Sequence, residues 1–356
     1  MKTKILRNIF ITVGVLFAST QLLASGMNDG VLSFSKTPLV SPQATFITFD
    51  APGGQRDMLP SGINPSGTIT GTYVTGSLVF HGFLRAPDGT FTTFDPPGST
   101  LTENLCINAA GTIAGTYFDA SGAVHGFLRA PDGTFTTFDP PGSTFTVPTG
   151  INAAGTIAGF YYDASGAAHG FLGASDGTFT TFDVPGDVNG TYAEGINPAG
   201  TIAGEYADAS FVFHGFLRAS DGTITTFDVP DGVNGTQPIG INPAGAIVGT
   251  YFDTNFVGHG FLRAPDGTFT TFDPPGSNPN ASVGGINPGG AITGWYVDVN
   301  SFVHSFVRAP NGTFIAPLDA PGFPSGTFAA VINPAGVITG EYFEFSGAAH
   351  GFLRIP

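Results

Sequence analysis

The chain has 356 residues, a formal net charge of −15 and only 10% charged residues, but 53 Gly, 28 Pro and 35 Phe. Abundant Gly, Pro, Thr and Phe are typical of short strands joined by tight turns rather than of helices. An acidic chain with 11 Lys and Arg residues repels nucleic acid and anionic lipid, so neither is expected as a partner.

The N-terminus is predicted to direct export. Lys2, Lys4 and Arg7 precede the apolar run Ile9–Phe17, so residues 1–25 have the pattern of a cleaved secretory signal peptide. Because this run is short for a membrane span, the mature protein is expected to be periplasmic or extracellular and not membrane-spanning. Cys106 is the single cysteine, so no intrachain disulfide can form, and we interpret it as a packing residue.

Residues 26–44 have no periodicity and are interpreted as a leader, whereas residues 45–356 are a tandem repeat expected to form one domain. The segment His81–Gly98 (HGFLRAPDGTFTTFDPPG) recurs nearly unchanged at His125–Gly142 and His259–Gly276. Three markers each occur seven times, 44 to 46 residues apart: a His, at 81, 125, 169, 214, 259, 304 and 350; an Ile-Asn, at Asn64, Asn108, Asn152, Asn197, Asn242, Asn287 and Asn333; and a Gly-x-Tyr, at Tyr73, Tyr117, Tyr161, Tyr206, Tyr251, Tyr296 and Tyr342. A fixed period of this length in a β-rich chain indicates propeller blades.

Each repeat is predicted to form four antiparallel strands. In the first copy these are a strand leading into Gly62–Asn64, then Thr68–Tyr73, His81–Arg85 and Thr90–Asp95, separated by Gly- and Pro-containing turns. The last copy ends at Pro356 without its fourth strand, and the missing segment, residues 45–50, opens the repeat region. The predicted fold is therefore an all-β, seven-bladed β-propeller that closes by pairing residues 45–50 in the last blade, which removes an exposed edge.

The motifs HGFLR and GINPAGTIAG resemble those of the HAF-repeat family of bacterial extracellular proteins, over nearly all of Thr45–Pro356. The tripeptide here is His-Gly-Phe in six copies and His-Ser-Phe at His304, never His-Ala-Phe. The resemblance implies export and a propeller-like fold. Because the activity of that family is largely unassigned, it supplies no catalytic residues.

The seven His residues are interpreted as structural. Equivalent positions on adjacent blades should lie about 10 Å apart or more, too far for two of them to share a metal ion. We expect each side chain to tie its strand to a neighbouring turn by a hydrogen bond. The residues are His81, His125, His169, His214, His259, His304 and His350.

The recurring Asp residues are assigned mainly to turns. One set ends the fourth strand, a second lies in the Ala-Pro-Asp-Gly hairpin, and a third follows the Gly-x-Tyr marker. A calcium role for the third set is an alternative, although that loop lacks the alternating carboxylates of a dense oxygen cage. Its members are Asp119, Asp163, Asp208, Asp253 and Asp298. No metal ion or cofactor is predicted.

Candidate binding residues lie where the repeat is irregular. The segment between the fourth strand and the next first strand differs in every copy and contributes Arg56, Asp57, Glu103, Asn104, Tyr192, Glu194 and Gln237. The residue inside Gly-x-Tyr also varies and contributes Phe160, Glu205, Trp295 and Glu341. Trp and carboxylates gathered at one mouth of a channel would suit a sugar. Drift at exposed positions explains the same variation without a function.

These observations favour an exported, non-catalytic propeller that binds a polysaccharide or an envelope component. An enzyme such as a polysaccharide lyase or glycoside hydrolase is the second hypothesis, and Glu205, Glu341, Arg56 and Asp57 are its only plausible donors. A purely structural extracellular repeat is the third. No nucleophile motif or phosphate-binding loop is recognisable.

Overall fold

Short strands and tight turns make up the whole of the described chain. The computed structural model describes residues 44–53, 56–322 and 325–356, and residues 45–356 form one compact unit. The predicted signal peptide and all but the last residue of the predicted leader lie outside the described residues. Among the residues that the structure describes, no helical segment has the length and hydropathy that a membrane span requires.

Each repeat contributes four antiparallel strands, named here by their order within it. The inner strands are β2 (Arg56–Ile63), β6 (Ser99–Ile107), β10 (Ser143–Ile151), β14 (Thr191–Ile196), β18 (Thr236–Ile241), β22 (Ser277–Ile286) and β26 (Gly326–Ile332). The second strands are β3 (Ile69–Val74), β7 (Ile113–Asp119), β11 (Ile157–Asp163), β15 (Ile202–Ala207), β19 (Ile247–Phe252), β23 (Ile292–Asp298) and β27 (Ile338–Phe343). The third strands are β4 (Phe80–Arg85), β8 (Val124–Arg129), β12 (Ala168–Gly173), β16 (Phe213–Arg218), β20 (Gly258–Arg263), β24 (Val303–Arg308) and β28 (Ala349–Ile355). The outer strands are β5 (Phe91–Phe94), β9 (Phe135–Phe138), β13 (Phe179–Phe182), β17 (Ile224–Phe227), β21 (Phe269–Phe272), β25 (Phe314–Leu318) and β1 (Thr45–Phe49).

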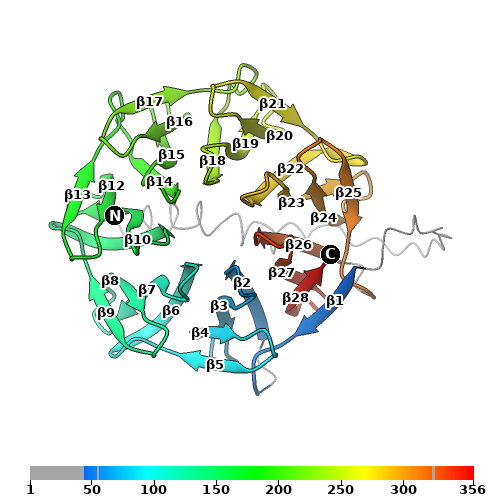
Figure 1. The fold of residues 1–356 in the computed structure, drawn as a ribbon, viewed down its shortest axis with the longest axis horizontal. Coiled ribbons are helices and arrows are strands. Elements are labelled where there is room, and N and C mark those ends of the chain that lie inside the picture. Colours follow the sequence, from blue (N-terminus) through cyan, green and yellow to red (C-terminus); the bar gives the residue numbers. More distant parts are fainter. Residues whose placement is uncertain (1–43, 54–55, 323–324) are drawn as a thin grey trace. The chain divides into compact units, whose positions relative to one another are not determined.

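The four-strand sets are arranged around a common centre, with the inner strands facing it and the outer strands at the periphery (Figure 1). The set β26–β28 takes its outer strand from the front of the chain, because β1 pairs antiparallel with β28 over Thr45↔Ile355 to Phe49↔Gly351. The inner strand β2 lies beside β26, β27 and β28, so the first and last repeats are neighbours. Single parallel bridges, Phe145↔Val124 and Val303↔Gly326, join two further pairs of sets.

Both faces of each sheet are apolar because each sheet is covered by a neighbour on either side. Phe91 packs on Phe49 of one adjacent outer strand, with ring centroids 5.9 Å apart. Phe94, three residues later and on the opposite face, packs on Phe127 and Phe135 of the next sheet at 6.4 and 5.9 Å. The Phe-Thr-Thr-Phe strand therefore serves two interfaces, as its period of two dictates.

The glycine of His-Gly-Phe makes room for an outer-strand ring. A Cβ on Gly126 would lie 2.5 Å from the Phe138 ring, and one on Gly215 would lie 2.4 Å from the Phe227 ring. The sixth repeat departs from this pattern at both partners together. There Ser305 replaces the glycine and is paired with Leu318, so no ring covers that position.

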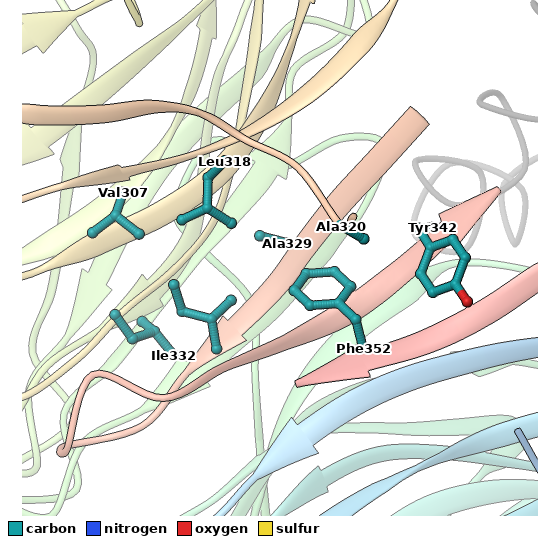
Figure 2. Packing of buried hydrophobic residues seen from close by; sticks show 8 residues of the cluster. Val307, Leu318, Ala320, Ala329, Ile332, Tyr342 and Phe352 are labelled. Carbon is teal, nitrogen blue, oxygen red and sulfur yellow. The ribbon is translucent and has the colours of Figure 1, made fainter. Parts of the chain in front are cut away.

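Packing between the sixth and seventh repeats shows how adjacent sheets join. Figure 2 shows Val307 and Leu318 of β24 and β25 on one side, with Ile332, Ala329 and Phe352 of β26 and β28 on the other. Phe352 has no exposed surface, and the same is true of the equivalent Phe of every other repeat. The core is thus divided into similar layers between successive sheets.

The Ile-Asn marker forms a buried turn that also links neighbouring repeats. Asn64 Oδ1 accepts hydrogen bonds from the Thr68 N–H at 2.9 Å and from the Ser66 hydroxyl at 2.7 Å. In other copies the amide donates across to the next repeat. Asn108 Nδ2 donates to the Asn152 carbonyl at 3.2 Å, and Asn333 Nδ2 donates to the Asn64 carbonyl at 3.2 Å.

The inner strands are longer than the sequence indicates. The variable segments, which we expected to be links before the first strand, form much of the inner strands themselves, as in Ser99–Ile107. Each inner strand pairs with its second strand through backbone groups and contains a bulge close to its end, for example between Pro148 and Gly150. Backbone pairing places no demand on side-chain identity, so strand formation survives the sequence variation.

Replacement of Asn333 by alanine should destabilise the fold strongly. The variant loses the bond to the Asn64 carbonyl and the turn bonds from the Ala335 and Val337 N–H groups, all at buried or part-buried positions. We expect the free energy of unfolding, from urea denaturation, to fall by about 2–4 kcal/mol. The exposed turn residue Asn311, which bonds only to Thr313, is the control, and Asn311→Ala should cost less than about 1 kcal/mol. Equal losses would contradict a linking role for Asn333.

Candidate functional site on the loop face

One face of the repeat region carries the longer and more variable connections. Because consecutive strands are antiparallel, the loops from second to third strands and the links from outer strands to the next inner strand share one edge of the sheets. We call this edge the loop face. Asn189 of a link donates to the Asp208 carbonyl of a loop at 2.5 Å, and Asn234 donates to the Asp253 carbonyl at 2.6 Å, so links and loops are in contact.

Each His lies just beneath the loop face beside the Asp that ends an outer strand, and among the described residues all but His81 have a second carboxylate near Nε2. His125 Nδ1 lies 2.7 Å from Asp139 Oδ2, and its Nε2 lies 3.5 Å from Asp119 Oδ2. Its ring packs on Tyr117 with centroids 5.1 Å apart. Asp139 in turn accepts a 2.6 Å hydrogen bond from the Thr146 hydroxyl of the next inner strand. The His side chain is therefore part of a connection between adjacent sheets, and we keep the structural interpretation.

The contact of Nδ1 with the outer-strand Asp recurs at the other His residues. The distances from Nδ1 to the outer-strand Asp range from 2.6 to 3.1 Å at His81, His169, His214, His259, His304 and His350. Burial alone would lower the pKa of His304, but hydrogen bonds and charge from Asp319 and Asp298 outweigh it and raise that pKa. The pKa values of His125 and His169 are raised by the same balance.

The carboxylates of the second-to-third-strand loops are used within their own turns. Asp119 Oδ1 accepts hydrogen bonds from the Ser121 hydroxyl at 2.6 Å and from the Ser121 and Ala123 N–H groups. Chiefly the Ser121 hydroxyl, with help from these N–H groups, lowers the Asp119 pKa to about 2. In the described part of the chain, no group of three or more His, Cys, Asp or Glu is placed to hold a metal ion.

The variable residues inside Gly-x-Tyr do not gather at an open mouth. They lie between neighbouring sheets, where each meets the next inner strand. Phe160 packs on Tyr192 at 5.1 Å, Trp295 packs on Phe328 at 5.4 Å, and the Gln237 amide donates to Glu205 Oε1 at 3.4 Å. Phe160, Glu205 and Glu341 are 3%, 9% and 5% exposed, and Trp295 is half-buried. Their variation therefore changes the contacts between sheets rather than an exposed surface.

Two of the predicted residues form an interior carboxyl pair. Glu194 of β14 and Glu205 of β15 interact electrostatically, and Tyr192 lies directly opposite Glu205 in the strand pairing. Burial raises the pKa of Glu194 to about 8, and burial followed by the charge of Glu194 raises that of Glu205 well above its usual range. The raised pKa values favour the protonated form of both groups. Glu103 of β6 is separate, and burial raises its pKa to about 7.

A second acidic group lies between the first and last repeats. Asp57 accepts a 3.2 Å hydrogen bond from the Ala349 N–H, and its charge adds to the effect of burial in raising the Glu341 pKa to about 8. Asp57 also lines a cavity of about 310 Å³ with Val74, Thr75, Gly76 and Leu78. Arg56 begins β2 opposite Val74. Nothing is described of its side chain or of the Asn104 side chain.

Exposed apolar residues on the loop face were absent from the sequence predictions. Leu78, Phe211 and Phe256 have φ angles of 59°, 62° and 60°, the left-handed region, and are 78%, 68% and 74% exposed. Other copies carry a glycine at this position, as at Gly122 and Gly166. The remaining exposed apolar residues of this face are Val188, Val233, Val299, Phe302 and Phe345. A Phe at a turn position where other repeats have Gly is the sequence signal that could have found them.

Comparison with known proteins supports the fold and leaves the activity open. No protein-family model and no curated protein sequence matches the chain. Among solved structures it is similar to virginiamycin B lyase from Staphylococcus aureus, with a TM-score of 0.59 and 15% identity over 88% of this chain and 100% of that one. A prolyl endopeptidase structure gives a TM-score of 0.63 and 12% identity over 84% of this chain and 48% of that one. A lectin from Burkholderia pseudomallei gives a TM-score of 0.53 and 11% identity over 84% of this chain and 95% of that one. At these identities the likeness shows a propeller-like fold alone.

His304 should stabilise the fold more in mild acid than in mild base. Its pKa is raised above the ordinary value of 6.5, so its added stability is complete below that value and is lost as the pH rises through the folded-state pKa. We expect His304→Gln to lower the melting temperature more at pH 5.5 than at pH 8.5. Asn311→Ala, which removes no titrating group, should give the same shift at both. A larger His304→Gln effect at pH 8.5 would reverse the assigned direction.

Glu205→Gln should protect the fold at alkaline pH. A buried carboxyl with a raised pKa leaves the fold stable while protonated and destabilises it as the pH rises through that value. We expect the variant to melt within a few degrees of the native protein at pH 6, since Gln keeps the neutral shape, and at a higher temperature at pH 9.5. Glu344→Gln, at a half-exposed carboxyl, is the matched control and should show no such gain. Equal melting at pH 9.5 would contradict the expected alkaline destabilisation by Glu205.

Proposed function

We propose that the chain is an exported, non-catalytic, seven-bladed β-propeller that binds a protein partner through its loop face. In this proposal β1 completes the last blade and closes the ring. The pairing of β1 with β28 and the contact of β2 with β26–β28 support closure. The observation that carries the binding function is the set of exposed apolar side chains on one face, three of which, Leu78, Phe211 and Phe256, are in left-handed turn positions.

Leu78, Phe211 and Phe256 are unfavourable for an isolated fold in two respects. A non-glycine residue in the left-handed region costs roughly 1 kcal/mol or more, and each of these side chains exposes apolar surface to water. Gly122 and Gly166 show that the same turn forms without either penalty. Contiguous exposed apolar surface on a water-soluble fold marks an interaction site.

The apolar residues follow one another around the face. The loops after β3, β15, β19, β23 and β27 carry them, whereas the loops after β7 and β11 carry none. Because β2 lies beside β27 and β28, the loops that carry them form one continuous arc. Val188 adjoins the loop of Phe211, and Val233 adjoins that of Phe256, through the Asn189 and Asn234 bonds described above.

The chemistry of the arc favours an apolar partner surface that is positively charged. Half of the residues are aliphatic and offer no ring on which a sugar could stack. The carboxylates of the face surround them, and the side chains of Asp50, Asp183 and Asp228 are 50%, 54% and 49% exposed. Such a surface attracts basic proteins and repels anionic lipid.

The structure bears on each of the three hypotheses drawn from the sequence. The residues proposed for sugar stacking are largely buried, so polysaccharide becomes an outcome to be tested. Of the donors named for an enzyme, Asp57 and Glu341 interact between the first and last repeats, whereas Glu205 lies apart on β15. Glu341 is buried, and no specific observation favours a lyase or hydrolase. A purely structural repeat would show no saturable binding.

The test is a triple variant, Leu78→Gly, Phe211→Gly and Phe256→Gly. Relief of backbone strain and the greater freedom of glycine in the unfolded chain should nearly cancel, so the free energy of unfolding stays within about 2 kcal/mol of the native value. The probe is an amphipathic 18-residue Leu/Lys peptide, with a Leu/Glu peptide, a glycan array and phosphatidylcholine vesicles in parallel. We expect the Leu/Lys peptide to bind saturably and the triple variant to bind it at least about tenfold more weakly.

Ile315→Ser and Ile355→Ser supply the control, because both residues are exposed apolar side chains on strands away from the loop face. They should leave peptide binding unchanged. Binding that survives the triple substitution, or binding of glycans or vesicles in place of the peptide, would overturn the proposal.

A further inference from the structure

The third strands end in the same basic residue in all repeats but one. Six repeats carry an arginine at this position, and the third repeat carries Gly173. Where the preceding outer strand ends in a phenylalanine, the guanidinium carbon lies 4.8–5.0 Å from the centre of that ring. The outer strand before Arg354 ends at Leu318, which has no ring. The five arginines that cover a ring are Arg85, Arg129, Arg218, Arg263 and Arg308.

The ring of Phe138, the last residue of β9, differs because the third repeat has no arginine to cover it. Among the described residues, no guanidinium lies over this ring. The hairpin from third to outer strand shows the consequence. A Cβ on its glycine would lie 3.5 Å from the arginine Nη2 in five repeats, whereas one on Gly177 would meet no heavy atom within 4 Å beyond its chain neighbours. Ala174 and Gly177 are exposed, and their equivalents in those five repeats are part-buried.

The third repeat has also closed the route that an arginine stem takes in the other repeats. A Cβ on Gly173 would lie 2.9 Å from the ring of Phe179. That ring is stacked on Phe138 with an interplanar angle of 28°, whereas the equivalent pairs in four repeats with the arginine are tilted by 49–55°. A guanidinium would therefore reach the open space beside Gly177 from the solvent side, as part of another chain.

The other groups that receive a guanidinium are present in the third repeat. In the first repeat, Arg85 Nη1 donates to the Ala86 carbonyl at 3.4 Å, and Asp88 of the hairpin interacts electrostatically with the same guanidinium. Ala174 and Asp176 occupy the equivalent positions. An aromatic ring, a carbonyl oxygen and a carboxylate together suit a planar cation that stacks and donates several hydrogen bonds.

We infer that the third repeat binds the guanidinium group of an arginine side chain from a partner protein, over Phe138 and beside Ala174 and Asp176. The other repeats supply the template, since each places this group on the equivalent ring. A lysine ammonium fits less well, because it is a strongly hydrated point charge without a planar face. The hairpin lies at the edge of the sheets opposite the loop face, so the inference is independent of the proposed function.

The experiment titrates the full mature protein with acetyl-arginine amide and follows the chemical shifts of labelled protein by NMR. Acetyl-lysine amide, which keeps the charge without the planar group, and acetyl-citrulline amide, which keeps a planar group without the charge, are titrated in parallel. We expect saturable shifts around Ala174 and Gly177 with the arginine compound. The other two compounds should bind at least about fivefold more weakly.

Three variants test the assigned groups. Gly173→Arg should remove binding, because its own guanidinium would compete for the Phe138 ring. Phe138→Leu and Asp176→Asn should each weaken binding of acetyl-arginine amide at least about threefold, through loss of the ring and of the carboxylate charge. The sixth repeat carries Leu318 and Asn311 at these two positions, so the fold accepts both residues.

Asp132→Asn is the matched control, since it changes the same hairpin position in the second repeat, where Arg129 already lies over Phe94. It should bind acetyl-arginine amide as the native protein does. Equal affinity for the lysine or citrulline compound, similar shifts at the hairpins of other repeats, or unchanged affinity in Phe138→Leu and Asp176→Asn would overturn the inference. If Gly173→Arg does not fold, these last two variants decide.

Failure of this inference and failure of the proposed function give different results. The triple variant of Leu78, Phe211 and Phe256 changes only the loop face, so it should bind acetyl-arginine amide with native affinity. Loss of Leu/Lys peptide binding in that variant, with no arginine site at Gly177, leaves the loop face as the binding surface and overturns only the inference. A site at Gly177 with peptide binding that survives the triple substitution overturns only the proposed function.

Discussion

The structure depends on the stacking of a third-strand phenylalanine over a second-strand glycine. A Cβ on Gly71 would lie 2.6 Å from the Phe83 ring and 2.3 Å from the Leu59 carbonyl of the inner strand, so no other residue fits. The ring that fills this space has no exposed surface in any copy. The arginine two residues later lies over the outer phenylalanine of the preceding sheet, with Arg85 5.0 Å from the centre of the Phe49 ring. The third strand thus packs its own sheet through its Phe and joins that sheet to the preceding one through its Arg. Sequence differences between repeats have to preserve these contacts.

The strands were predictable from sequence because their markers carry these packing requirements. His81–Arg85 was expected and Phe80–Arg85 is found, and the four-strand sets follow the repeat. The length of the inner strands was underestimated, because their side chains vary between repeats while their backbone hydrogen bonds do not. The candidate site was harder to predict for a related reason. Positions such as Trp295 and Glu205 vary between repeats because each contacts a different neighbouring strand. Phe211 is one of 35 phenylalanines, and only its position in a turn distinguishes it from the others.

The acidic residues divide into two populations with opposite behaviour. Burial raises the pKa of Glu103 to about 7 and that of Glu194 to about 8, so the interior glutamates carry less charge at neutral pH than exposed ones. Hydrogen bonds from turn hydroxyls and N–H groups lower the pKa of Asp119 and Asp163 to about 2, so the turn aspartates are ionised. The negative charge of the chain is therefore concentrated on the turns and loops. A formal charge counted from the sequence does not show this asymmetry between interior and turns.

The same residues connect the strands of a sheet and hold the loops that carry the exposed apolar side chains. Asp208 Oδ1 accepts the Ser210 and Val212 N–H groups at 2.7 and 2.9 Å, which fixes the turn that holds Phe211 outward. Its other oxygen lies 3.6 Å from Nε2 of His214, which is anchored to Asp228. These bonds define the backbone of the turn, and in the proposed function a pre-organised turn loses little conformational entropy when a partner binds. In the proposed function, the repeated His and Asp residues act only through the loop they hold. A scaffold with uniform repeats can thus carry a surface that differs from one repeat to the next.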